Sequence, residues 1–143
     1  MTQQVKKPAS PLRVGLTQFK PLKADVSGNL EAIRSRWIPA NREADILVFP
    51  ETALTGYFLE GGVVDVALPV EEVGEGLGEA DFESPTVILG FYERWRRGIF
   101  NSVACFEPRE GVYRPVHVHR KLFQPTYGVF EEARFADPGR ELK

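Results

Sequence analysis

The apolar positions along the chain follow two different periods before residue 40. Residues 12–19, LRVGLTQF, alternate apolar and polar side chains, and this period of two predicts a first β-strand. In residues 29–37 the apolar positions instead recur every three to four residues, which predicts an amphipathic helix. Either Asp25 or Ser27 can cap this helix, and Pro39 is expected to end or kink it.

A short, continuously apolar run follows at residues 46–49, ILVF, and predicts a buried strand. Pro50 ends this strand and leaves Glu51 at its carboxyl end. Strand, helix and strand in this order predict a right-handed βαβ unit with parallel strands. Open α/β sheets carry out chemistry in the crevice beyond the strand ends, so Glu51 is a candidate catalytic acid or base. A solvated glutamate in a turn is the alternative that this stretch leaves open.

The pattern is weak between residues 58 and 84. Residues 63–67 are apolar enough to begin a short helix or strand. Residues 74–78, GEGLG, are predicted to form a loop. They are not a phosphate-binding loop, because they lack the GxGxxG spacing and the lysine of that motif, and their glutamates would repel phosphate.

The last third of the chain has the pattern of a β-meander. Three apolar segments predict strands, and two segments rich in charge and glycine predict the turns between them. The strands are expected at residues 86–91, 98–106 and 112–122, and the turns at residues 94–98 and 107–111. Hairpins that follow a βαβ unit predict an α/β fold with a mixed sheet.

Composition and charge exclude some classes of function. The 143 residues suit one domain, with a flexible tail at residues 1–11 and a folded domain at residues 12–143. The 18 Lys and Arg residues nearly balance the 20 Asp and Glu residues, which is not the charge pattern of a nucleic-acid-binding protein. No apolar run approaches the ~20 residues of a membrane helix, and residues 1–11 do not look like a secretory signal. A cytoplasmic location is therefore expected, with neither a membrane nor a nucleic acid as partner.

A lysine occupies a position similar to that of Glu51. Lys121 ends the last predicted strand, and the loop that follows it carries Tyr127, Glu131 and Glu132. A lysine and a carboxylate that leave strand ends on one rim of a sheet can form a fixed ion pair beside a reactive centre. They can equally be two surface charges, and their spacing does not decide between these alternatives.

The remaining reactive side chains are interpreted as structural. His117 and His119 lie two residues apart and therefore on one face of a strand, but no third metal ligand is evident, so no metal site is predicted. Cys105 has apolar neighbours in its strand, and burial of this kind makes a cysteine a small hydrophobe with a raised thiol pKa. It is therefore expected to be a poor nucleophile.

Three segments together resemble the carbon–nitrogen hydrolase, or nitrilase, superfamily. They are LVFPETALTGY, GIFNSVACF and HRKLFQPTYGVFEEARFADPG, and the resemblance extends over residues 12–139. It implies the N-terminal half of a nitrilase-like αββα sandwich. In that family a glutamate, a lysine and a cysteine hydrolyse amides, nitriles or carbamoyl compounds through a thioester, without a metal or an organic cofactor.

The resemblance assigns a role to individual residues of this chain. It implies that Glu51 is the base, that Lys121 is the catalytic lysine and that Glu132 supports the lysine, with Glu131 as the fallback for this last role. It also suggests that Tyr127 lines the substrate pocket. The expected partners are a small-molecule substrate and further copies of the chain in a homo-oligomer.

The nucleophile is the point at which the chain departs from the family. The family's cysteine follows the lysine by a few tens of residues, whereas Cys105 precedes Lys121 and lies within a strand. The chain is therefore expected to be truncated before the nucleophile, to be inactive alone, and to leave one sheet face and its edges exposed. Two alternatives remain: the glutaminase domain of an NAD synthetase, suggested by YGVFEE, and a non-catalytic remnant or binding module.

Overall fold

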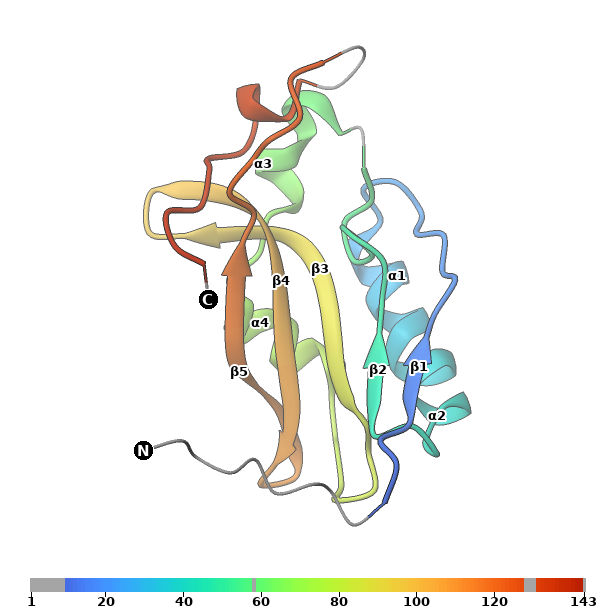
Figure 1. The fold of residues 1–143 in the computed structure, drawn as a ribbon. Coiled ribbons are helices and arrows are strands. Elements are labelled where there is room, and N and C mark those ends of the chain that lie inside the picture. Colours follow the sequence, from blue (N-terminus) through green and yellow to red (C-terminus); the bar gives the residue numbers. More distant parts are fainter. Residues whose placement is uncertain (1–9, 58, 128–130, 143) are drawn as a thin grey trace, which may run out of the picture.

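A mixed five-stranded sheet forms the centre of the fold, in the strand order β1-β2-β3-β4-β5 (Figure 1). The computed structural model describes residues 10–57, 59–127 and 131–142. The strands are Val14–Leu16 (β1), Ile46–Val48 (β2), Thr86–Trp95 (β3), Gly98–Arg109 (β4) and Val112–Arg120 (β5). Strands β1, β2 and β3 run parallel, whereas β4 and β5 continue the sheet as antiparallel hairpins. This confirms the mixed α/β sheet, including the parallel pairing of the first two strands.

The first helix begins where the sequence indicates a cap. Helix α1 is Val26–Ala32, and Asp25 caps it by accepting a hydrogen bond from the Gly28 amide at 3.0 Å. The helical path continues through a π-helical segment, Ile33–Trp37 (η1), and a final turn, Ile38–Ala40 (α2). Pro39 lies in that final turn, so the helix ends close to the expected position.

The loop predicted for residues 74–78 is wrong, because most of it is helical. Helix α4 is Val70–Leu77, preceded by the short segments Glu60–Gly62 (η2) and Val63–Val66 (α3). A Cβ atom at Gly74 would lie 2.9 Å from the backbone oxygen of Tyr113 on β5, and one at Gly76 would collide with Leu30 on α1. The glycines therefore allow close helix packing, and the turn signal belongs only to Gly78, which follows the helix with a φ of 82°.

The helices lie on one face of the sheet. Helices α1, α2 and α4 lie behind the strands in Figure 1, and the main core is formed between these layers. Leu47, Val87, Leu89 and Phe106 point into this core and are fully buried. On β1, by contrast, Leu16 is 77% exposed. The opposite face of the sheet is therefore apolar in part and open, as the half-sandwich prediction requires.

The hairpins are longer and their turns tighter than the sequence pattern predicts. Only Arg96–Arg97 separates β3 from β4, and only Glu110–Gly111 separates β4 from β5. Arg96, Glu110 and Gly111 have positive φ angles, which two-residue hairpin turns favour. The strands therefore take up residues that the pattern assigned to the turns. At the other end of the sheet, β1 is shorter than the strand expected at residues 12–19.

Two expectations concern regions beyond this sheet. Most of the tail predicted for residues 1–11, namely residues 1–9, lies outside the described residues, so this part of the prediction stays untested. No helix in the described part of the chain has both the length and the apolar character needed to cross a bilayer.

Candidate active site

Glu51 is held by a tight turn that follows β2 and lies against β3. The Phe49 amide donates to the oxygen of Ile88 at 2.9 Å, and the Leu54 amide donates to the oxygen of Gly90 at 3.1 Å. Thr52, in the middle of this turn, has a φ of 51°, which is unusual for a β-branched residue. A Cβ atom at position 90 would lie 2.7 Å from the Thr52 amide nitrogen, so glycine is needed there for the close approach.

Lys121 follows β5 directly and joins the two glutamates. Its amide donates to the oxygen of Asn101 on β4 at 2.9 Å, which fixes its backbone beside that strand. Its Nζ lies 2.7 Å from Glu51 Oε1 and 3.0 Å from Glu132 Oε2. The structure therefore brings the three residues together, and Glu51 and Lys121 are not two separate surface charges.

Two further residues complete this cluster, although the sequence analysis gave them no role. The Asn101 side chain donates to Glu51 Oε1 at 2.7 Å and also to Glu132 Oε1. The Tyr57 hydroxyl donates to Glu132 Oε2 at 3.2 Å. Both residues belong to segments that carry the family resemblance, which was the available signal for their participation.

The two glutamates have different surroundings. Glu132, the first residue of the short helix η3 (Glu132–Arg134), has a side chain only 3% exposed, and both of its oxygens accept hydrogen bonds. The Glu51 side chain is 54% exposed; its Oε1 binds Lys121 and Asn101, and its Oε2 has no partner among the described residues. Glu131, the fallback partner of the lysine, instead pairs with Arg134 at 2.7 Å.

The surroundings of Lys121 favour its charged form. Partial burial acts to lower the pKa of Lys121, but hydrogen bonds and charge from Glu51 and Glu132 outweigh it, so the pKa is raised. Burial, with the charge of Glu132, raises the pKa of Tyr57 to about 12. At neutral pH the cluster therefore contains a charged ammonium group and a neutral phenol beside the two glutamates.

The cluster opens into a cavity of about 500 Å³, large enough for a small molecule. Glu51, Asn101 and Lys121 contribute polar groups to its wall. The other lining residues are mostly apolar: Phe49, Pro50, Gly90, Ser102, Val103, His119, Leu122, Phe123 and Leu142. Tyr127 is 73% exposed and is not among the described residues that line this cavity, so its role in substrate binding stays a prediction.

Cys105 and the two histidines lie on strands β4 and β5. Cys105 is half-buried rather than fully buried, and it pairs across the strands with His117, which is exposed. Burial, followed by the charge of Glu107, raises the pKa of the Cys105 thiol, in the direction predicted from its neighbours. His119 lines the cavity, but in the described part of the chain no group of three or more His, Cys, Asp or Glu residues is arranged to hold a metal ion.

This geometry suits one kind of chemistry. An accessible carboxylate oxygen on Glu51 can take up and return a proton, while the ammonium group of Lys121 can stabilise negative charge that develops nearby. Glu132 and Asn101 hold Lys121 and Glu51 in position relative to each other. The cluster thus provides a base and an electrostatic stabiliser beside a cavity with apolar walls.

Comparison with known proteins gives consistent results. The family model for carbon-nitrogen hydrolase matches residues 13–140. A glutamine-dependent NAD(+) synthetase from Thermotoga maritima is 34% identical over 137 residues, which cover 92% of this chain and 23% of the relative. An arylacetonitrilase from Macrophomina phaseolina is 30% identical over 144 residues, which cover 90% of this chain and 40% of the relative.

A solved structure has the same arrangement of elements. The glutamine-dependent NAD+ synthetase from Acinetobacter baumannii, in complex with ADP, superposes with a TM-score of 0.73 at 24% identity. The match covers 91% of this chain and 24% of that structure. The chain thus spans about a quarter of the synthetases that it resembles.

Proposed function

Because the chain belongs to the carbon-nitrogen hydrolase family, we propose that its cluster of Glu51, Lys121 and Glu132 hydrolyses a small, non-peptide amide or nitrile. The observation that carries the proposal is the position of Lys121 Nζ, within 3.0 Å of both glutamates. One of these glutamates keeps an accessible oxygen at the cavity, and the other is buried. A surface ion pair would not need this second, buried carboxylate.

The proposed reaction uses a thiolate as the nucleophile. Glu51 takes the proton of a cysteine thiol, and the sulfur attacks the carbon of the C–N group. For an amide, the ammonium group of Lys121 stabilises the negative oxygen that forms. For an amide, the C–N bond then breaks, Glu51 returns the proton to the leaving nitrogen and ammonia departs. For a nitrile, the thioimidate that forms first takes up one water molecule, and the resulting tetrahedral species then loses ammonia in the same way. Water activated by Glu51 finally cleaves the thioester, which yields a carboxylic acid and regenerates the thiol.

Cys105 does not meet the requirements for this nucleophile. It lies within β4, it is not among the described residues that line the cavity, and its thiol pKa is raised. A thiolate has to lie within reach of Glu51 Oε2, at the open side of the carboxylate. The proposal therefore requires a cysteine that the 143 residues do not supply.

The remaining residues of the cluster act as positioning residues under this proposal. Asn101 binds one oxygen of each glutamate and so sets the distance between them. Glu132 holds Lys121 charged and in place, and the Tyr57 hydroxyl fixes Glu132 by a hydrogen bond. No metal or organic cofactor takes part in any step.

Two substrates are the first candidates, each supported by a relative. Glutamine is favoured because the Thermotoga relative is a glutamine-dependent synthetase, and under this candidate the chain is a glutaminase unit that releases ammonia from the side-chain amide. An arylacetonitrile is supported by the Macrophomina relative, which is 30% identical. Both reactions release ammonia, so one assay compares them.

The test measures ammonia release by the chain and by two variants, each in the presence of the cysteine-bearing partner or segment. Glu51→Gln and Lys121→Ala are each expected to lower turnover by about two powers of ten or more, the usual scale for a general base or a charge stabiliser. His117→Ala is the matched control, since His117 is exposed and lies outside the described lining of the cavity. Near-normal turnover in either cluster variant would remove that residue from the mechanism.

The same assay separates the enzyme from the non-catalytic alternative. A binding module would release no ammonia from glutamine, from phenylacetonitrile or from simple amides, even when a cysteine-bearing partner or segment is present. Activity that appears only with such a partner or segment would support the proposal that this chain supplies the glutamates and the lysine and that the partner or segment supplies the cysteine. Activity in the isolated chain would contradict our assignment of the nucleophile.

A further inference from the structure

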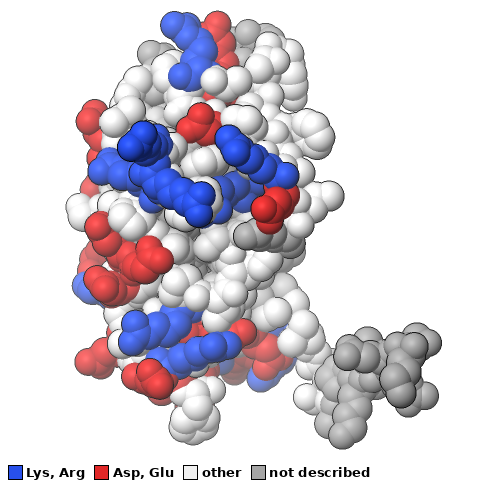
Figure 2. Space-filling model, turned by 90° about the vertical axis from the view of Figure 1, so that its left-hand side faces the viewer, with Lys and Arg blue, Asp and Glu red and all other residues white. Residues whose placement is uncertain are grey.

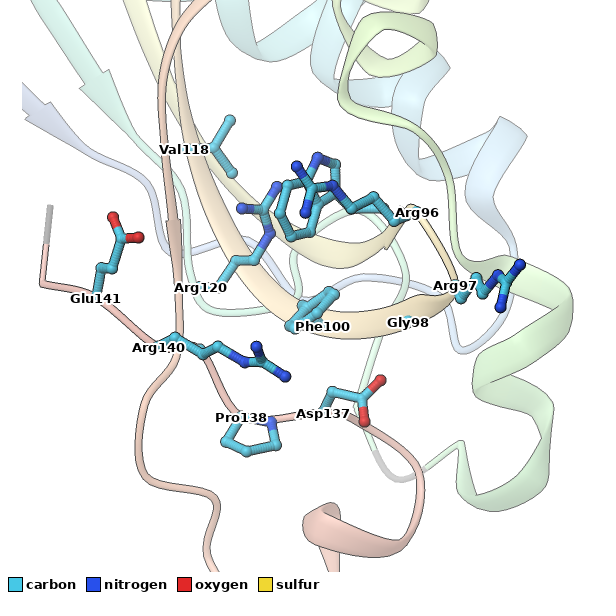
Figure 3. A pocket seen from close by; sticks show the side chains of 12 residues that line it. Arg96, Arg97, Gly98, Phe100, Val118, Arg120, Asp137, Pro138, Arg140 and Glu141 are labelled. Carbon is cyan, nitrogen blue, oxygen red and sulfur yellow. The ribbon is translucent and has the colours of Figure 1, made fainter.

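A second cavity, of about 490 Å³, lies between the β3–β4 turn and residues 137–141 (Figure 3). Its described lining does not include the residues of the Glu51–Lys121 cluster. Four of the lining residues are arginines, namely Arg96, Arg97, Arg120 and Arg140. The acidic lining residues are Asp137 and Glu141, so positive charge predominates around the cavity.

Arg120 is held rigidly at one wall of this cavity. Its Nε and Nη2 atoms bind the Glu93 carboxylate at 2.7 and 2.6 Å, and Glu93 is buried beneath it with a side chain only 1% exposed. Ser102 donates a further hydrogen bond to Glu93 at 2.7 Å, which fixes the carboxylate. Because one edge of the guanidinium group is occupied, Nη1 remains to donate to a ligand.

Trp95 stacks against two of the arginines. The guanidinium carbon of Arg120 lies 3.7 Å from the centre of the Trp95 ring, and that of Arg96 lies 4.3 Å from the same centre. Two guanidinium groups this close to one ring centre cannot share a face, so they lie against opposite faces of the indole ring. Glu93 neutralises only Arg120, and the charge of Arg96 remains to attract an anion.

The other arginines add positive charge that is not held in an ion pair with any described carboxylate. Arg96, Arg97 and Arg140 make no ion pair with a described residue, whereas Arg42, Arg109 and several other arginines elsewhere do. Figure 3 shows the Arg140 side chain directed into the space between Phe100 and Pro138, whereas Arg97 points away from it. Figure 2 shows Lys and Arg side chains gathered in a band across one face of the molecule.

We propose that this cavity binds a phosphate-type dianion, either free phosphate or the phosphate group of a small molecule. Nη1 of Arg120 and the guanidinium groups of Arg96 and Arg140 donate to its oxygens. Planar guanidinium groups suit the paired oxygens of a phosphate, and a concave wall that excludes part of the water strengthens the attraction. The volume leaves room for a small organic group beside the phosphate. This inference does not depend on the proposed hydrolase activity.

Inorganic phosphate is the probe for the test, and Trp95 is the reporter. Trp37 is the only other tryptophan, so in the Trp37→Phe variant all tryptophan fluorescence comes from Trp95. Phosphate replaces chloride in the buffer so that the ionic strength stays constant. Otherwise the screening of charges by added salt would itself change the fluorescence. Isothermal titration calorimetry measures phosphate binding to the unsubstituted chain, so the result does not depend on the Trp37→Phe substitution. Saturable binding of one phosphate per chain is expected in both experiments.

Arginine variants test the location of this binding. Arg96→Ala and Arg140→Ala are each expected to weaken phosphate binding by about tenfold or more, the usual effect of a lost charge-assisted hydrogen bond. Arg114→Ala is the matched control, because it removes an exposed arginine outside the cavity and leaves binding unchanged. Arg120 is not replaced, since its loss would leave Glu93 buried and unpaired.

Three results would overturn the proposal. One is the absence of saturable phosphate binding in both titrations. Another is equal weakening in Arg96→Ala, Arg140→Ala and Arg114→Ala, which would indicate only nonspecific attraction to net charge. The third is saturation by succinate but not by phosphate, which would assign the cavity to dicarboxylates. Glucose 6-phosphate, compared with phosphate, then distinguishes a phosphate ester from the free ion as the tighter ligand.

Discussion

The two glutamates that bind Lys121 have the same carboxylate group, but their different surroundings suit them to different roles. Glu51 keeps one oxygen accessible at the cavity, whereas Glu132 is buried with both oxygens bound. Only Glu51 can take a proton from a reacting group without breaking an existing hydrogen bond. Glu132 is suited to keep the charge and position of Lys121.

Replacing Glu132 with glutamine tests this division. Glu132→Gln keeps the shape of the side chain but removes one of the two charges that raise the pKa of Lys121. The pKa of Lys121 should therefore fall, and the alkaline limb of the pH profile of ammonia release should move to lower pH. Glu131→Gln is the matched control, since Glu131 pairs with Arg134 on the surface. An unmoved alkaline limb in Glu132→Gln would show that Glu132 does not control the charge of Lys121.

Asn101 holds two carboxylates through one side-chain amide, and an aspartate at this position should destabilise the fold. Asn101→Asp replaces a donor by an acceptor and adds a third negative charge beside Glu51 and Glu132. We expect the free energy of unfolding to fall by about 1–3 kcal/mol or more at pH 7. The repulsion should raise the folded-state pKa of the new carboxyl, so the penalty should shrink as the pH falls and the group becomes protonated. Urea denaturation at pH 7 and at about pH 4 measures this difference, and a penalty independent of pH would contradict it.

The sequence predicts the parts of this cluster that lie at strand ends. Glu51 and Lys121 follow apolar strands, so a simple pattern places them on a rim, and the family resemblance adds Glu132. Asn101 and Tyr57 were not assigned, because an asparagine within a strand and a tyrosine in a loop have no spacing that identifies their partners. Their hydrogen bonds cross 31 to 75 residues of chain, and only the folded sheet brings these groups together.

At the scale of elements, the site depends on how closely the turn after β2 approaches β3. Gly90→Ala would place a Cβ atom 2.7 Å from the Thr52 amide nitrogen and 3.0 Å from the Pro50 oxygen. These are backbone atoms that cannot rotate away, so the turn that carries Glu51 has to move. We expect a loss of about 1–3 kcal/mol in the free energy of unfolding, together with reduced ammonia release.

A second glycine provides the control for that substitution. Apart from its neighbours along the chain, no described residue has an atom within 4 Å of a Cβ added at Gly61, so Gly61→Ala should leave both stability and ammonia release nearly unchanged. Chemical denaturation and the ammonia assay on the two variants make the comparison. Equal stability of Gly90→Ala and Gly61→Ala would mean that the close approach does not constrain the turn.

Elements with a clear period were predicted better than those that depend on tertiary contacts. Strands β2 to β5 and the α1 segment follow their hydrophobic patterns, and Asp25 caps the helix as one of two candidates. Helix α4 was missed because Gly74, Gly76 and Gly78 together look like a loop. Two of these glycines instead permit close packing against β5 and α1, which a local pattern does not show.

At the scale of the whole molecule, the described residues cover one face of the sheet fully and the other only at one end, where Tyr92 on β3 is buried against a second, smaller cluster. Helices α1, α2 and α4 bury one face, whereas Leu16 and Val14 on β1 remain exposed on the other. The family resemblance predicted this asymmetry, since a sandwich half has one face for helices and one for a second sheet. An apolar sheet face of this kind favours association, so a homo-oligomer stays our expectation for the chain.

Alkaline pH should destabilise the whole fold, because several groups have raised pKa values. Burial raises the pKa of Tyr57 and that of Tyr113 to about 12, and it also raises that of Tyr92. The pKa of Lys121 is raised as well. A group with a raised folded-state pKa contributes stability that is present below its unfolded pKa and is lost as the pH rises through the folded value. For the tyrosines and Lys121 this window begins at about pH 10.

We therefore expect the free energy of unfolding attributable to these groups to hold up to about pH 9 and to fall above about pH 10. Each raised group can contribute up to about 1.4 kcal/mol for each pH unit in this window, less where it is partly exposed. Urea denaturation followed by circular dichroism between pH 8 and about pH 11.5 measures the decline. Tyr113→Phe, which removes one buried hydroxyl, should make it less steep. A decline as steep in this variant as in the unmodified chain would show that Tyr113 ionises as readily in the folded chain as in the unfolded one.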